Sequence, residues 1–403
     1  MGILNFATFA LFAFAIFVMN CNPKEDDKTK DFIAARALIG CSSLDECFSN
    51  MASLSKTGAS FQVFKKNGTR VYLKETGDLT STKTGPIFSA SKLVTASLIL
   101  RLVDQGLMSL DETTGTRLGW TGVKGQIKLR QLLAFTSGLN PSSPSAESKS
   151  CIFTLPAGAS ATDKNNCVTS IRDSTQTLKA PGDVFYYNSF HMAVAQRMAE
   201  IAAGQTWQQI FDTEFAAAGK LNFSATDPDN GKWYADITSK SGDGSLAGAY
   251  GLFINAVDYS KILNMLINDG IYTPATGAPV AILTGGSRVA LIRELFSDQY
   301  QSQTTIEYSQ FAAFGYRWHY GLGNWRFCST PDVPSTCELD IVYHSFGANG
   351  FYPWIDRNAG YYAVVGVNNF NTNVFSVFSL LQPNSTSLFF GQDAKRFIPP
   401  LLQ

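Results

Sequence analysis

The chain has 403 residues, 45% of them hydrophobic and 16% charged, so it is long enough for a large core and more than one subdomain. Lys and Arg together number 32, as do Asp and Glu, which gives a formal net charge of zero and no basic field for nucleic acid. We find no internal repeat, heptad pattern or long low-complexity tract, so solenoid and coiled-coil architectures are excluded as well.

The first predicted element is a signal peptide or signal anchor at residues 1–20, which contain no charged side chain and are mostly apolar. Cys21 follows directly and indicates bacterial lipidation, although Asn20 is not the small residue that lipidation signals prefer. The polar segment 21–30 would then be a flexible tether. A cleaved secreted form and a retained membrane anchor are the alternatives. In each case we expect an exported protein, either secreted or held at the cell envelope as a periplasmic or surface lipoprotein.

The cysteine count also predicts export. Apart from Cys21 there are six cysteines, and they fall into three pairs that are close in sequence. An even number arranged in short loops predicts three disulfides in an oxidising compartment: Cys41–Cys47, Cys151–Cys167 and Cys328–Cys337. Metal binding is the alternative, but no Cys-x-x-Cys occurs and the three histidines are scattered, so we predict no metal site.

The first folded elements are expected to be strands followed by a helix. Two β-rich runs, 60–64 and 70–73, flank an Asn-Gly pair at 67–68, which is typical of a hairpin. From 88 to 103 apolar residues recur at three- and four-residue spacing, which predicts an amphipathic helix, and Gly106 marks its end.

Ser89 lies at the start of this helix, with Lys92 one turn later on the same face. The positive end of a helix favours an oxyanion at the serine and disfavours a charged lysine, and a neutral amine beside a hydroxyl can activate it as a nucleophile. The alternative is an N-cap serine beside a solvated lysine. The same Ser-x-x-Lys spacing recurs at Ser53 and Lys56, where no helical pattern follows.

The middle of the chain is predicted to be mostly helix and loop, with helical patterns at 129–133, 192–203, 207–218 and 255–267. The last hundred residues turn β-rich again, at 314–318, 341–344 and 361–367, before a closing helix at 375–381. We therefore predict an α/β (α+β) fold in which both chain ends, 31–110 and 300–403, build one antiparallel sheet flanked by helices. The intervening 111–299 would form a helical subdomain, with the functional site in the cleft between the two parts.

Several of these segments, in this order, resemble motifs of the class C β-lactamase and penicillin-binding-protein family of serine hydrolases. Residues 88–92 match its Ser-x-x-Lys motif after an aromatic residue. Residues 132–139 are similar to its Leu-Leu-x-His-Thr-Ser-Gly-Leu, with Phe135 in the histidine position. Residues 247–252 and 257–259 resemble its Ala-Gly-Gly-Leu and Asp-Tyr segments. The resemblance implies a β-lactamase/DD-peptidase-like fold, an acyl-enzyme on the motif serine and no cofactor.

The family's second motif, Tyr-x-Asn, has two possible registers here. Tyr186-Tyr187-Asn188 fits literally, but the family usually places its tyrosine six residues after the proline of a Pro-Gly pair, which selects Tyr187 and leaves Ser189 in the asparagine position. We prefer Tyr187. The resemblance implies that it shuttles the proton of Ser89, with its pKa lowered by the neighbouring amine when that amine is charged.

The third motif, a Lys/His-Ser/Thr-Gly strand, corresponds to residues 343–350. His344 stands where β-lactamases commonly carry lysine, followed by Ser345, and Phe346 stands where glycine is usual. In this register the resemblance implies that the Gly347 and Ser89 N–H groups form the oxyanion hole. A neutral His344 would bind a substrate carboxylate poorly, which favours an esterase or peptide amidase over a β-lactamase.

The sequence thus predicts an exported serine hydrolase that cleaves an ester or amide through an acyl-enzyme on Ser89, with Lys92 and Tyr187 transferring protons. A D-alanyl-D-alanine carboxypeptidase or β-lactamase is the alternative within this class. A catalytically inactive cell-envelope binding module is the alternative from another class. We expect a small-molecule or peptide substrate and no nucleic-acid partner. Membrane attachment, in the lipidated or anchored form, would be through the N-terminus, and the oligomeric state stays open.

Overall fold

The structure is a computed structural model that describes residues 41–55, 57–175, 179–242, 246–309, 318–327, 342–367 and 383–403. The predicted signal segment, the tether with Cys21, the Cys328–Cys337 pair and the closing helix at 375–381 lie outside the described residues.

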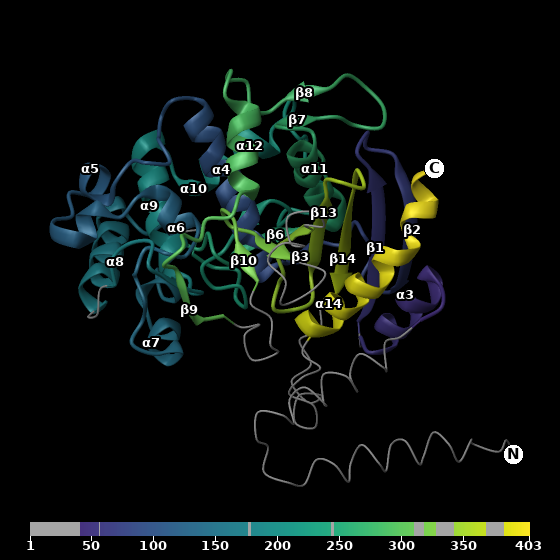
Figure 1. Cartoon of the computed structure of the whole chain (residues 1–403), viewed down its shortest axis with the longest axis horizontal. Helices are drawn as coiled ribbons and strands as arrows, with labels where there is room; N and C mark the ends of the chain where they lie inside the picture. The colour runs from purple at the N-terminus through teal and green to yellow at the C-terminus, as the bar shows by residue number, and fades with distance from the viewer. Residues whose placement is uncertain are drawn as a thin grey trace, which may run out of the picture.

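The main sheet is antiparallel and joins the two ends of the described chain, as predicted (Figure 1). Its order is β10-β11-β12-β13-β14-β1-β2, so the N-terminal hairpin pairs with C-terminal strands through β1 and β14. The strands run β1 Gly58–Lys65, β2 Arg70–Gly77, β10 His319–Tyr320, β11 Trp325–Phe327, β12 Val342–His344, β13 Tyr352–Asp356 and β14 Tyr361–Val367. Gly68, at a φ of +86°, makes the tight turn of the predicted hairpin.

Helices cover both faces of this sheet. On one face Phe61 of β1 meets Phe390 of α14 (Pro383–Ala394) edge to face, at 4.8 Å between ring centroids. On the other face Asn264 of α11 (Ala256–Ile267) donates to the Tyr362 hydroxyl at 3.0 Å. Helix α3 (Leu44–Ser53) packs beside α14. Strand β1 is therefore buried almost throughout, whereas the edge strand β2 is largely exposed.

The central helix α4 (Ser91–Asp104) lies between the sheet and the helical half, and nearly all of its residues are buried. A helix buried on every side must satisfy its polar side chains internally. The Ser97 hydroxyl donates to the Leu93 carbonyl, and Arg101 pairs with Asp104 and Glu214. Burial therefore extends beyond the single apolar face that the sequence pattern predicted.

The helical half is built from the middle of the chain, on the left of Figure 1. Its helices are α5 Thr114–Leu118, α6 Leu129–Leu133, α7 Pro144–Ser148, α8 Ala161–Ser174, α9 Phe190–Ala203, α10 Trp207–Phe211 and α12 Arg288–Phe296. The chain also forms short strands: β3 Gly85–Pro86, β4 Val184–Tyr186, β5 Lys232–Trp233, β6 Leu252–Ile254, β7 Ile271–Tyr272, β8 Val280–Ala281 and β9 Thr305–Tyr308. Of these, β7 and β8 pair with each other and lie beside α11 (Figure 1). Helix α11 falls within the predicted range 111–299 but packs on the sheet, against β14.

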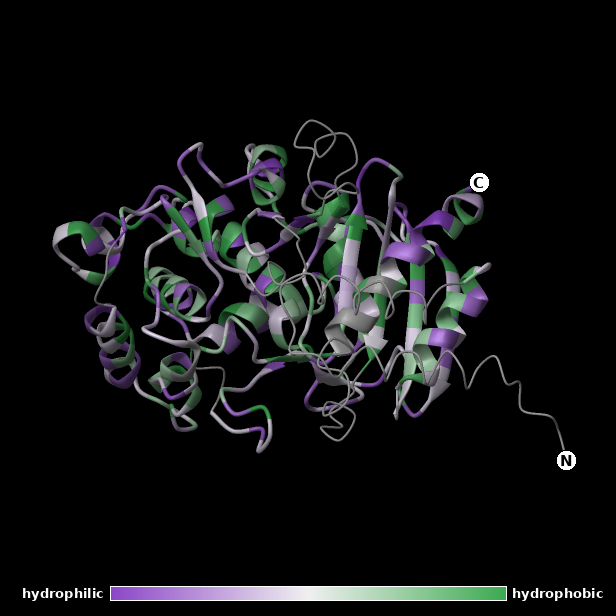
Figure 2. Cartoon of the chain, turned by 60° about the horizontal axis from the view of Figure 1, so that its bottom comes forward, coloured by the Kyte–Doolittle hydropathy of each residue, from purple (hydrophilic) through white to green (hydrophobic). Residues whose placement is uncertain are grey.

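Two of the predicted disulfides are present, Cys41–Cys47 and Cys151–Cys167, with Cα atoms 4.9 and 5.6 Å apart. Figure 2 shows hydrophobic positions concentrated in the strands and on inward helix faces, with hydrophilic positions along the loops and outer faces. Within the described ranges, no helix combines the length and the apolar character needed to cross a membrane.

Candidate active site

Ser89 lies in a short 3₁₀ turn, Phe88–Ala90, that runs directly into α4. The residue before it, Phe88, has a φ of +48°, in the left-handed region that residues with a side chain seldom adopt. The Ile87 N–H, donating to the Leu252 carbonyl at 3.0 Å, ties the start of this turn to β6. Local backbone strain of this kind persists only when the surrounding structure holds it, and here it places Ser89 at the positive end of α4.

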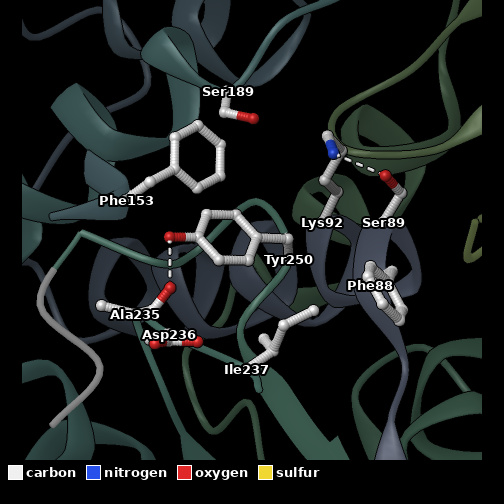
Figure 3. Close-up of a pocket in the computed structure, with 9 residues that line it drawn as sticks. All are labelled: Phe88, Ser89, Lys92, Phe153, Ser189, Ala235, Asp236, Ile237 and Tyr250. Atoms are coloured by element: carbon white, nitrogen blue, oxygen red, sulfur yellow. Dashed lines mark hydrogen bonds between the residues drawn. The ribbon is translucent and has the colours of Figure 1, made fainter. Parts of the chain in front are cut away.

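The side chains of Ser89 and Lys92 are in direct contact, as the spacing predicted. The Lys92 amine lies 2.9 Å from Ser89 Oγ and donates to the Ala249 carbonyl at 2.8 Å (Figure 3). Burial lowers the pKa of Lys92 to about 7, partly opposed by the negative charge of Glu147. An amine with this pKa is largely neutral just above pH 7 and can accept a proton from the hydroxyl beside it.

Tyr187 completes the cluster from the turn between β4 and α9. Its ring lies under the lysine, with Nζ 4.7 Å from the ring centroid, and its hydroxyl hydrogen-bonds to the Ser89 side chain. The ring is fixed by stacking on Trp325 and by an edge contact with Phe135, at centroid distances of 5.3 and 5.1 Å. Burial raises the pKa of Tyr187, so the predicted lowering by the amine is wrong and the phenol stays protonated at neutral pH.

The structure also separates the two registers of the second motif. The Tyr186 ring stacks on the Tyr308 ring, with the two ring centroids 5.1 Å apart. The Asn188 side chain is occupied by backbone groups: it accepts from the Phe190 N–H at 2.8 Å and donates to the Leu139 carbonyl. Tyr187 is thus the tyrosine that reaches Ser89, and Ser189, two residues later, lines the adjoining cavity.

That cavity has a volume of about 260 Å³ and opens beside Ser89 and Lys92 (Figure 3). Most of its wall is apolar, contributed by Phe88, Phe153, Ala235, Ile237 and Tyr250. Tyr250 stacks on the Phe153 ring at 4.9 Å, and its hydroxyl lies 2.9 Å from two carbonyls, those of Ile152 and Ala235. Figure 3 shows this aromatic pair across the cavity from Ser89.

Comparison with known proteins shows the family of this chain. A family model described as Beta-lactamase matches residues 48–379, which is most of the chain. This chain belongs to the beta-lactamase family. Members of the family are serine hydrolases, and the predicted enzyme class is confirmed at that level. A search of curated proteins gave no match.

Solved structures of the beta-lactamase fold match nearly the whole chain. A Bacteroides dorei protein assigned as a beta-lactamase is 24% identical, with a TM-score of 0.67, covering 88% of this chain and 97% of that one. Simvastatin synthase from Aspergillus terreus is 17% identical, with a TM-score of 0.59 and coverage of 88% and 98%. A D-stereospecific amidohydrolase from Streptomyces is 16% identical, with a TM-score of 0.54 and coverage of 84% and 94%. At these identities the matches show the shared fold, which confirms the predicted fold class.

The third beta-lactamase motif differs from its prediction. His344 is fully buried at the end of β12, and its ring is surrounded by Trp318, Phe327, Phe346 and Tyr352. Neither ring nitrogen has a hydrogen-bond partner among the described residues, and burial holds its pKa well below the usual value. Contrary to the prediction, His344 does not line the cavity, because these aromatic rings enclose it.

Gly347 is not free to form the predicted oxyanion hole either. Its N–H donates to the Phe351 carbonyl at 2.8 Å, closing the turn that follows β12. A Cβ atom on Gly347 would lie 2.3 Å from the Ile87 carbonyl, so a side chain does not fit there. Ser345 donates to the Ser89 carbonyl at 3.0 Å. This segment therefore supports the Ser89 turn from behind and does not line the substrate cavity.

Two features of the site were not identified from the sequence. Phe153 and Ile237 line the cavity from loops far apart in the chain, and no motif marks them. Glu147, in the short helix α7, accepts the Ser189 N–H at 2.7 Å. Across the described ranges, no group of three or more acidic, histidine or cysteine side chains is arranged to bind a metal.

Proposed function

We propose that this protein is an exported serine hydrolase that cleaves an uncharged ester or amide through an acyl-enzyme on Ser89. The observation that carries this proposal is the 2.9 Å contact between Ser89 Oγ and a buried Lys92 amine whose pKa is about 7. Export is supported by the two disulfides, which form in oxidising compartments.

In the proposed acylation step, neutral Lys92 accepts the Ser89 proton as Oγ bonds to the substrate carbonyl carbon. The protonated Tyr187 phenol, hydrogen-bonded to Ser89, relays this proton to the leaving alcohol or amine as its bond to the carbonyl breaks. With the Gly347 N–H occupied, we assign the oxyanion to the Ser89 N–H and the positive end of α4. Water then attacks the acyl carbon and gives a proton to the same pair. The pair returns this proton to Ser89 Oγ as the bond between Oγ and the acyl carbon breaks, and the carboxylic acid is released.

The cavity supports a substrate without a carboxylate near the bond that is cleaved. Of the described residues that line it, Lys92 is the only cation, and that amine is already engaged with Ser89 and Ala249. A carboxylate such as that of a penicillin or a D-alanyl terminus would meet apolar walls and Asp236 there. A short apolar acyl group would instead bury its surface against Phe153, Ile237 and Tyr250.

Intact-mass spectrometry tests the proposal. The purified protein and its Ser89→Ala variant are each incubated with a fluorophosphonate and, separately, with benzylpenicillin. We expect a fluorophosphonate adduct on the wild type alone and little or no penicillin adduct. A stable penicillin adduct, or its turnover, would favour a cell-wall peptidase or β-lactamase. A folded wild type that forms no adduct with either reagent would contradict the enzyme proposal and leave a binding module.

A further inference from the structure

Glu147 is a half-buried acid that reaches the site from the five-residue helix α7. Its Oε1 atom accepts the Ser189 N–H at 2.7 Å. Ser189 is the N-cap of the 14-residue helix α9, and its own side chain makes no capping hydrogen bond. The glutamate therefore makes the contact that the N3 side chain of a capping box makes, by accepting the backbone N–H of the N-cap residue at the positive end of the helix, where a negative charge is stabilised.

This contact fixes the turn that carries Tyr187. The turn leaves β4 at Tyr186 and enters α9 at Phe190, so the position of Tyr187 depends on how the helix begins. The other end of the turn is held by the Tyr187 N–H, which donates to the Tyr308 carbonyl at 3.0 Å. Glu147 thus holds the α9 side of a three-residue connection, 187–189, whose first residue, Tyr187, reaches Ser89.

Glu147 also adds a negative charge beside the proton-transfer pair. Its charge raises the pKa of both Lys92 and Tyr187. For Lys92 this opposes burial, which lowers the pKa and is the larger effect. For Tyr187 it acts in the same direction as burial, which also raises the pKa. The other groups that face the amine are neutral: Ser89, the Ala249 carbonyl and the Tyr187 ring. The cavity wall also carries Asp236, whose carboxylate accepts the Thr238 and Ser239 N–H groups.

We propose that Glu147 is a positioning residue of this site, which fixes the Tyr187 turn through its hydrogen bond with the Ser189 N–H and raises the pH at which the Ser89–Lys92 pair becomes active. The inference rests on the proposed function, because it needs Ser89 to be an activated nucleophile. It assigns Glu147 two separable roles. Glutamine at position 147 keeps an acceptor for the Ser189 N–H and removes the charge, whereas alanine removes both.

The test measures the rate of fluorophosphonate adduct formation on Ser89 from pH 5 to 9, which reports the nucleophile independently of substrate choice. The variants are Glu147→Gln and Glu147→Ala. Asp173→Asn is the charge-matched control, because Asp173 is an exposed acid of α8 that pairs with Arg172. Thermal unfolding of each protein verifies that it is folded.

For Glu147→Gln we expect the midpoint of the acid limb to fall by about half a pH unit, because removing a nearby negative charge makes the Lys92 proton easier to lose. The rate above pH 8 should stay within about twofold of the wild type. For Glu147→Ala we expect the same shift and, in addition, a loss of about tenfold above pH 8, since the Tyr187 turn loses its anchor. Asp173→Asn should match the wild type throughout.

If the rate of adduct formation depends on pH in the same way in the wild type and in Glu147→Gln, the electrostatic role is refuted. Equal rates above pH 8 for folded Glu147→Gln and Glu147→Ala would refute the positioning role. A wild type that forms no adduct at any pH would instead refute the proposed function, which is a different result from either of these.

Discussion

Replacing Lys92 with methionine should make the protein more stable while removing most of its reactivity. The side chain is 3% exposed, and burial lowers the pKa of Lys92 from 10.5 to about 7. Between these two values the unfolded chain holds a proton that the folded chain does not, so the free energy of unfolding rises with pH across that window. One pKa unit corresponds to about 1.36 kcal/mol, so the difference between the unfolded and folded pKa values of Lys92 destabilises the folded state at neutral pH by roughly 4 kcal/mol.

Methionine has a similar length and no charge, so the variant has no amine to desolvate on folding. It also loses the hydrogen bond to the Ala249 carbonyl, and a buried unpaired acceptor costs roughly 1–3 kcal/mol. We therefore expect Lys92→Met to raise the free energy of unfolding at pH 7 by roughly 1–3 kcal/mol. The rate of Ser89 acylation should fall by about 10²–10⁴-fold, since the proton acceptor is gone.

Urea unfolding at pH 7 and at pH 9 measures the stability of both proteins. The wild type should gain stability between these pH values relative to Lys92→Met, because only the wild type carries the buried amine. A variant that is less stable than the wild type at pH 7, with the same pH dependence, would refute the reasoning. The Lys92 amine would then not be held in the fold at a desolvation cost.

Three further predictions concern the same site. Acylation by a 4-nitrophenyl ester should rise about tenfold from pH 6 to pH 8, with a midpoint near the Lys92 pKa of about 7, as a stopped-flow pH profile would show. Tyr187→Phe should lower kcat by about 10²-fold, whereas Tyr186→Phe, which alters a ring stacked on Tyr308, should change it by less than about threefold. Gly347→Ala should lower the melting temperature and the acylation rate together, because its Cβ would press on the Ile87 carbonyl; the neighbouring Ala348→Gly variant is the control.

Several parts of this fold that were predicted correctly are determined by local pattern. The Asn-Gly hairpin and the α4 helix follow from neighbouring residues, so period and turn chemistry are enough to identify them. The contact between Ser89 and Lys92 follows from one helical turn. Tyr187 was selected over Tyr186 by motif spacing, and the structure shows the physical difference: Tyr187 contacts Ser89, whereas the Tyr186 ring stacks on Tyr308.

The parts that were missed depend on contacts between distant segments. The position of His344 was taken from a motif, but the aromatic rings that enclose it come from other strands and from the turn after β12. Whether the Gly347 N–H is free depends on the tightness of that turn, which the sequence does not reveal. Glu147 reaches Ser189 across 42 residues of chain, and the five-residue helix α7 that carries it is too short to show a periodic pattern in the sequence.

These differences change what the third motif does in this protein. Ser345 holds the Ser89 carbonyl, Gly347 lies against Ile87 and Asn349 donates to the Pro86 carbonyl at 2.6 Å, so the segment braces the strained turn before the nucleophile. This segment therefore makes the site rigid, but it provides no cation that could bind the substrate. Discrimination between substrates must then come from the opposite wall, where the Cys151–Cys167 disulfide and the Tyr250 hydroxyl fix the loop that carries Phe153. Substitutions at Phe153 should therefore change the preferred acyl group without changing the pH dependence that Lys92 sets.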